Sequence, residues 1–230
     1  MPDDAMPDDA MTAAQPERVP QTVLETPEEI AYELRAAQGA VWTGSRLVIG
    51  IAAFTFASLG FAYFYLRSTN NQDLWRPGGV TASVYLGTAV LVAALVSTLL
   101  SVYGAWRRRQ GAILDSEVAG WLTVLGGCLA VGMQVWQLFE LHFYPGSSGY
   151  ASCFIAWAVL NAALLLSGSY WTETILARGL RLRRAAEEEG STGPEQLSSE
   201  LVEIEVATSN HYWVFIGLVN VVFWFMFYVI

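Results

Sequence analysis

Five stretches of about 20 or more residues are almost entirely apolar, and they constrain this chain more than any other feature. They cover residues 42–66, 80–106, 118–143, 149–177 and 211–230. A helix that crosses the hydrocarbon core of a bilayer needs about 20 consecutive, mostly apolar residues. The sequence therefore predicts an all-α fold, a polytopic membrane helix bundle of five transmembrane helices.

The charged residues lie mainly outside these stretches. They make up only 14% of the chain, while 54% of the residues are hydrophobic, which leaves no room for a separate soluble domain. The formal net charge of -9 comes largely from two acidic segments outside the spans and indicates no particular partner. We expect no nucleic-acid partner.

The arginines predict the orientation, because short cytoplasmic loops of membrane proteins carry an excess of basic residues. The chain has no lysine, and its arginines gather at 107–109 after the second span and at 178–184 after the fourth. Arg67 and Arg76, after the first span, are a weaker contrary signal. The pattern predicts an N terminus inside and a C terminus outside. We expect the membrane to be a bacterial plasma (inner) membrane.

The polar segments predict the domain boundaries. Residues 1–25 contain a direct repeat and many prolines and are expected to be a disordered acidic N-terminal arm. Residues 26–41 are expected to form an interfacial amphipathic helix. The five-helix transmembrane domain is then 42–230, with a loop at 178–210 on the inside that contains a short helix.

The histidines limit the chemistry of this chain. Membrane haem and copper sites are built mainly from imidazole ligands, and the only two histidines, His142 and His211, fall at predicted span ends near opposite surfaces. We therefore expect no catalytic residue, no metal ligand set and no cofactor in this chain, and no catalysis by it alone.

Polar residues within the spans are candidate functional residues, because burying them in a membrane is costly. Gln134, Gln137 and Glu140 form a stripe at i, i+3 and i+6 in the outer part of the third span. Glu117 and Glu173 are better explained by pairing with a nearby arginine or by reaching the interface. For Glu140 a functional role and an ordinary interfacial position stay open.

Five segments follow one another along the chain with a distinctive pattern of aromatic, small and polar residues. They are Ala62-Tyr63-Phe64-Tyr65-Leu66-Arg67 followed by Trp75 and Pro77; Leu86-Gly87-Thr88; Gln134-x-x-Gln137-x-x-Glu140; Tyr150-Ala151-Ser152-x-Phe154; and His211-Tyr212-Trp213-Val214-Phe215. In this order they resemble subunit III of the haem–copper oxidases in its short five-helix form. The likeness covers roughly residues 45–230.

The resemblance implies an accessory role. Subunit III of that family carries no redox centre, packs against the catalytic subunit, holds phospholipid and supports the working lifetime of the oxidase. The implied partners are oxidase subunit I, with its haem and copper, subunit II, and phospholipid. We expect contact with lipid or a partner subunit at Gln134, Gln137, Glu140, Tyr150 and Trp213.

Departures from the family pattern put one part of this role in doubt. The family's glutamate in the first of these helices falls near Ala52 or Ala53, and its paired histidines fall at Asn161 and Leu164. Its histidine and aspartate in the last helix fall at Val214 and Gly217. A direct contribution to proton uptake is therefore not implied for this chain.

Two other functions remain as alternatives. The chain is also similar to the subunit III-like accessory proteins found beside nitric oxide reductases. A small independent membrane transporter would need an inverted repeat or broken helices around a midplane site. The two halves of the chain show no such similarity, and no proline lies inside a span.

Overall fold

The computed structural model describes residues 27–69, 74–189 and 194–230, and this part of the chain is helical with no strand. The helices are α1 (Pro27–Ser68), α2 (Val84–Arg109), α3 (Ile113–Phe139), α4 (Gly149–Glu189) and α5 (Pro194–Tyr228), with a short 3-10 helix at Pro77–Gly79. Each of the five α-helices contains a segment long and apolar enough to cross a membrane. The predicted all-α bundle of five spanning helices is confirmed.

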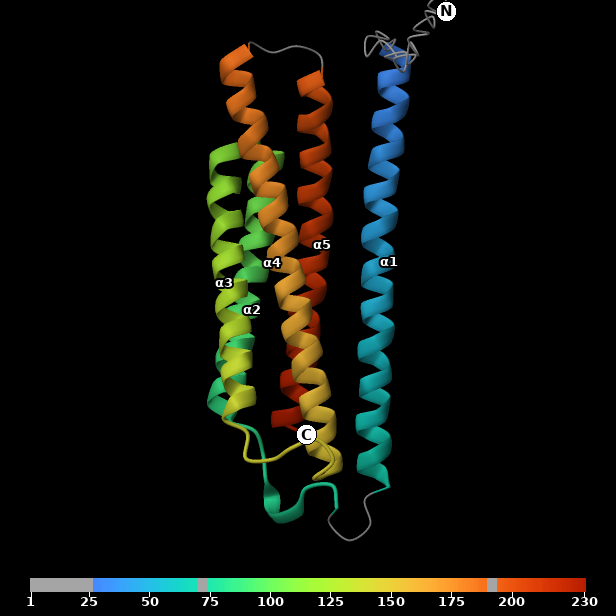
Figure 1. Ribbon diagram of the computed structural model, residues 1–230, viewed down its shortest axis with the longest axis vertical. Coiled ribbons are helices and arrows are strands. Elements are labelled where there is room, and N and C mark those ends of the chain that lie inside the picture. Colours follow the sequence, from blue (N-terminus) through green and yellow to red (C-terminus); the bar gives the residue numbers. More distant parts are fainter. Residues whose placement is uncertain (1–26, 70–73, 190–193) are drawn as a thin grey trace, which may run out of the picture.

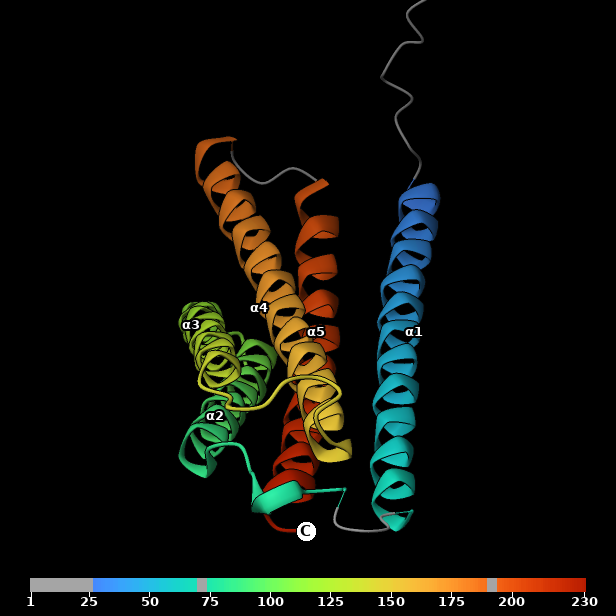
Figure 2. The same cartoon turned by 60° about the horizontal axis from the view of Figure 1, so that its bottom comes forward.

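The helices form a four-helix bundle with a fifth helix on its side. In this bundle α2 packs against α3 and α5, and α4 packs against α3 and α5. Helix α1 lies outside it and packs on α4 and α5 (Figures 1 and 2). The start of α1 and the end of α5 lie at opposite ends of the molecule, as an odd number of crossings requires (Figure 1). Which end faces the cytoplasm stays a prediction.

The connection between α2 and α3 is tight. Gly111 has φ +78°, a left-handed conformation in which a side chain would be strained. The Gly111 N–H bonds to the carbonyl of Arg108, one of the carbonyls left free at the end of α2. Helices α2 and α3 are therefore antiparallel neighbours, and their contact is the most extensive in the molecule.

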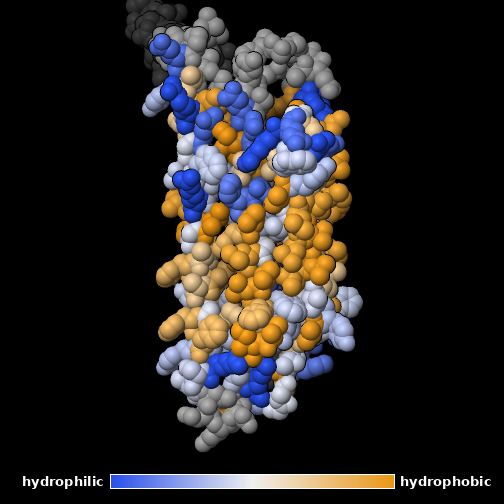
Figure 3. Space-filling view, turned by 180° about the vertical axis from the view of Figure 1, so that it is seen from behind, coloured by the Kyte–Doolittle hydropathy of each residue, from blue (hydrophilic) through white to orange (hydrophobic). Residues whose placement is uncertain are grey.

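The surface has the distribution that a bilayer requires. On the face seen in Figure 3, apolar side chains cover the middle of the molecule and hydrophilic side chains gather toward both ends. Large apolar side chains on the helices are well exposed, among them Phe54, Leu99, Leu125 and Phe139. In a membrane these faces contact lipid or another subunit.

The predicted loop at 178–210 is wrong, because most of it is helix. Helix α4 continues to Glu189 and α5 already begins at Pro194. The last part of α4 and the first part of α5 are polar, and ion pairs between helices stabilise them. Local hydropathy does not reveal such pairs. Pro194 occupies the first helical position of α5, where the missing N–H of proline has no helical partner to lose, and residues 190–193 lie outside the described part.

The predicted interfacial segment 26–41 is continuous with the first span. Helix α1 runs without interruption over 42 residues from Pro27 to Ser68. The expected disordered arm, 1–25, lies outside the described residues. A location of the first turns of α1 on the membrane surface stays a prediction.

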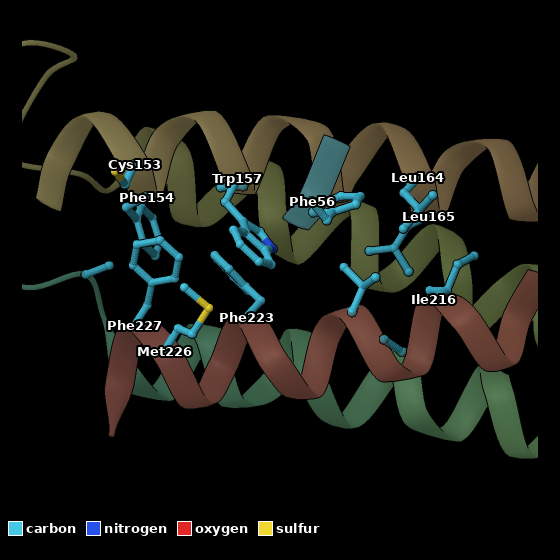
Figure 4. Packing of buried hydrophobic residues seen from close by; sticks show 14 of the residues in the cluster. Phe56, Cys153, Phe154, Trp157, Leu164, Leu165, Ile216, Phe223, Met226 and Phe227 are labelled. Carbon is cyan, nitrogen blue, oxygen red and sulfur yellow. The ribbon is translucent and has the colours of Figure 1, made fainter. Parts of the chain in front are cut away.

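The core of the bundle is aromatic at one end and aliphatic further along. Phe154 and Trp157 on α4 face Phe223 and Phe227 on α5, and Phe56 reaches this layer from α1 (Figure 4). The Trp157 and Phe223 rings are stacked with their centroids 5.7 Å apart. In a bilayer no hydrophobic effect drives helices together, because the surrounding lipid chains are themselves apolar. Close ring contacts of this kind stabilise helix packing there.

Candidate functional site

Polar side chains from three helices meet inside the bundle. Asn161 on α4 donates from Nδ2 to Gln134 Oε1 on α3 at 3.2 Å and to Asn220 Oδ1 on α5 at 3.0 Å. Gln134 in turn donates to Gln137 Oε1 at 3.0 Å. All four side chains are at most 1% exposed. They are joined by Tyr228, and we call these five residues the amide network.

The network ends at one end of the bundle. Gln137 Nε2 donates to the Tyr228 hydroxyl at 2.6 Å and to the Ser83 carbonyl, just before α2, at 3.0 Å. Four of the five helices are therefore linked by one set of hydrogen bonds. Within hydrocarbon an unpaired amide is costly, so such a set favours one mutual arrangement of the helices.

The chemistry of the network is that of neutral hydrogen-bonding groups. Asparagine and glutamine do not ionise, so these four side chains neither carry charge nor exchange protons with a substrate. One acceptor is left over, because Asn161 Oδ1 is buried and has no partner among the described residues. The arrangement is suited to positioning helices.

The structure brings together only part of the predicted polar stripe. Gln134 and Gln137 are fully buried inside the network, so their side chains contact this chain itself and not its surroundings. Glu140 follows the last residue of α3 and is exposed. Contact between Glu140 and lipid or a partner stays a prediction.

Tyr150, a second predicted contact residue, is also internal. It is 1% exposed, and its ring centroid lies 6.1 Å from that of Trp75 and 5.7 Å from that of Phe227. Its backbone N–H donates to the Trp75 carbonyl at 3.2 Å. Tyr63 and Phe154 complete this group of rings, which we call the Phe227 cluster.

Trp213, the third such residue, lies in the middle of the bundle. It is 0% exposed, and its Nε1 donates to Thr172 Oγ1 on α4 at 2.8 Å. Its carbonyl accepts from Thr98 on α2 at 3.0 Å. The expectation that Gln134, Gln137, Tyr150 and Trp213 contact lipid or a partner is therefore corrected, since all four are enclosed by their own chain.

Three ion pairs hold the arginine-rich end of the bundle. Arg183 Nη1 on α4 lies 2.9 Å from Glu117 Oε2 on α3. Arg178 on α4 pairs with Glu205 on α5. Arg107 at the end of α2 pairs with Asp115 at the start of α3.

The predicted arginine pairing is confirmed for one glutamate only. Glu117 pairs with Arg183, whereas Glu173 is exposed and its expected partner, Arg178, pairs with Glu205. Both pairs join residues of different helices and stabilise the extensions of α4 and α5 beyond the apolar segments.

The histidines lie far apart on the chain and in different settings. His142 is in the connection between α3 and α4, and His211 is on α5 with its ring edge toward Trp42 at 5.4 Å between centroids. In the described part of the chain, no three His, Cys, Asp or Glu side chains are grouped as metal ligands.

Comparison with known proteins adds no relative. No protein-family model matches the chain, and no curated protein matches it at a significant level. The resemblance to subunit III therefore rests on the sequence segments alone and stays a prediction.

Sequence reasoning missed Asn161, Asn220 and Tyr228 as members of one network. The available signal was the position of both asparagines in the middle of apolar stretches, where a polar side chain requires a partner. It did not indicate which helices would meet. Which side chains pair across helices depends on how each helix is rotated about its own axis. The local sequence does not specify this rotation.

Replacing Asn161 by Leu is expected to lower the free energy of unfolding by about 1–2 kcal/mol, because Gln134 and Asn220 each lose a buried hydrogen bond. A denaturant titration of the purified chain in detergent measures this change. The control Gln110→Leu removes an exposed amide at the end of α2 and is expected to change the value by less than about 0.5 kcal/mol. An equal effect of both variants would contradict a stabilising role for the network.

Proposed function

We propose that this chain is a non-catalytic accessory subunit of a haem–copper respiratory oxidase in a bacterial plasma membrane. In this role it packs on the catalytic subunit I, holds phospholipid and stabilises the assembled complex. Haem and copper belong to the partner subunit. The proposal is supported by one observation, namely that four of the five segments resembling subunit III meet at the C-terminal end of α5.

Two of these segments reach residues 224–228 from α1 and from the start of α4. The Tyr63 hydroxyl donates to the Met226 carbonyl at 2.6 Å. Arg76, which lies between Trp75 and Pro77, donates to the Phe227 carbonyl at 3.3 Å. Tyr150 packs its ring against Phe227.

The other two reach the same end of α5 from α2 and α3. Thr88 accepts a hydrogen bond from Trp224 Nε1 at 3.0 Å, and Gln137 donates to the Tyr228 hydroxyl. A side chain at Gly87 would collide with the Tyr228 ring. Residues dispersed over the sequence therefore meet at one end of α5.

The contacts of these residues favour a framework role over a reactive one. Asn161, at a position where the family carries a histidine, belongs to a neutral network, and Leu164 at the second such position is buried in the apolar core. At these two positions the packing is retained, while neither Asn161 nor Leu164 can transfer a proton. Packing and lipid binding are the roles that need only the framework.

The test is a pull-down in mild detergent through a tag on the N terminus, with an absorbance spectrum and mass spectrometry of the eluate. We expect a haem-containing subunit I in near-equal amount. A nitric oxide reductase catalytic subunit in its place would favour the related accessory role. A colourless chain, alone or as a homo-oligomer, would overturn the proposal and favour a transporter.

Glu140→Gln tests the one predicted contact residue that is exposed. We expect this variant to recover about half or less of the wild-type amount of subunit I if Glu140 contacts the partner, because removing one member of a charged contact weakens binding. Glu173→Gln, also exposed but at the other end of the bundle, is the matched control. Full recovery with both variants would remove Glu140 as a contact residue.

A further inference from the structure

A cavity of about 40 Å³ lies inside the four-helix bundle, close to the turn between α2 and α3. Residues of α2, α3, α4 and α5 line it. Among them are Gly104, Gly120 and Gly179, which add no side chain to this space. A buried water molecule needs roughly 10–15 Å³, so the cavity has room for about three of them.

Hydroxyl groups from all four helices line the cavity. Two of them, on Thr172 and Ser209, bond to each other at 3.1 Å. Ser116 on α3 is 5% exposed, and its hydroxyl forms no hydrogen bond with the described part of the chain. A buried hydroxyl that loses its hydrogen bonds to water without gaining another partner is costly. The cavity is the space in which a partner for Ser116 fits.

Two charged side chains line the same cavity. Arg108 on α2 forms no hydrogen bond or ion pair with any residue in the described ranges. Glu117 on α3, which is 9% exposed, accepts from Arg183 through Oε2 at 2.9 Å, while its Oε1 accepts from none of the described residues. The cavity wall therefore carries unpaired donors on Arg108 and an unpaired acceptor on Glu117.

We propose that this cavity binds a cluster of about three water molecules, which link Arg108 to Glu117 Oε1 and to the Ser116 hydroxyl. The ligand of such a site accepts from a guanidinium and donates to a carboxylate. A monatomic anion has no proton to donate, and a metal cation has no lone pair with which to accept. An organic ligand with both kinds of group is too large for about 40 Å³. Water meets all of these requirements.

Arg108 also connects the cavity to the aqueous end of the bundle. It lines a second hollow of about 170 Å³ together with the exposed residues Arg109 and Glu203. This hollow lies near the α2–α3 turn, beyond which α4 and α5 extend (Figure 1). Water therefore enters past the Arg108 side chain. From Arg108 to Ser101, which also lines the cavity, α2 rises about 10 Å, so hydration reaches about this far into the bundle. This inference is independent of the proposed function.

X-ray footprinting of the purified full chain in detergent tests for this water. Radiolysis turns water into hydroxyl radicals, which oxidise the side chains beside a bound water even where these are buried. Leu176 and Leu164 are a matched pair on α4, since they are 8% and 7% exposed, but Leu176 lines the cavity and Leu164 lies in the apolar core. We expect several-fold more oxidation at Leu176, measured by mass spectrometry of the peptides. Equal oxidation of the two leucines overturns the proposal.

A cavity-filling variant localises the water. Gly179→Leu adds a side chain to the cavity at a position where a Cβ makes only an ordinary contact, 3.8 Å from Val202. We expect it to lower the oxidation of Leu176 to the level of Leu164. Gly132→Leu, at an open position of α3 outside the cavity lining, is the control and is expected to leave this oxidation unchanged. A Leu176 signal that persists in Gly179→Leu contradicts the site. A wild-type signal that changes when chloride replaces gluconate as the salt also contradicts it, because such a dependence indicates a bound anion.

Discussion

Replacing Trp213 by Ala is expected to lower the free energy of unfolding by about 3–5 kcal/mol, the range for truncating a large buried aromatic side chain. Trp213 is 0% exposed and contacts residues of three other helices. Truncation leaves a cavity among these helices and also removes the donor to Thr172. A denaturant titration in detergent, followed by far-ultraviolet circular dichroism, measures the loss.

Trp136→Ala is the matched control for this prediction. Trp136 on α3 is 63% exposed, so its ring lies in the membrane-facing surface of the isolated chain. We expect its truncation to change the free energy of unfolding by less than about 0.5 kcal/mol. Equal losses for the two tryptophans would mean that Trp213 does not hold the bundle together.

The number of helices follows from the sequence because the bilayer imposes a length. An apolar run of about 20 residues has few alternatives to a spanning helix, and each of the five runs lies in a helix long and apolar enough to cross a membrane. The C-terminal part of α4 and the N-terminal part of α5 could not be predicted from apolar runs. They are polar, and they are stabilised by Arg178–Glu205 and Arg183–Glu117, pairs between residues far apart in the sequence.

The site was predictable only along a single helix. The spacing of Gln134 and Gln137 places both on one face of α3, and the structure joins them directly. Asn161, which donates to Gln134, comes from another helix, so no local pattern points to it. Trp213 is a different case, because contact with lipid or a partner was expected there, whereas packing against α2 and α4 buries it completely.

The close contact that buries Trp213 depends on a glycine of α3. A Cβ built at Gly127 would lie 2.7 Å from Trp213 Cη2 and would also collide with Ser169 Oγ on α4. Small residues at such positions allow membrane helices to approach closely. The position therefore tolerates no larger side chain without separating α3 from α4 and α5.

Gly127→Leu is accordingly expected to lower the free energy of unfolding by about 2–3 kcal/mol, since overpacking forces neighbouring side chains or helices to shift. Gly132→Leu makes the same change five residues later on α3, where a Cβ meets no atom within 4 Å. Both variants gain the same helix propensity, about 0.8 kcal/mol over glycine, so their difference isolates the packing at Gly127. We expect Gly132→Leu to leave stability unchanged or slightly raised in the same titration. If the two variants are equally stable, the contact of α3 with Trp213 is not a determinant of the bundle, and the large loss expected for Trp213→Ala would need another cause.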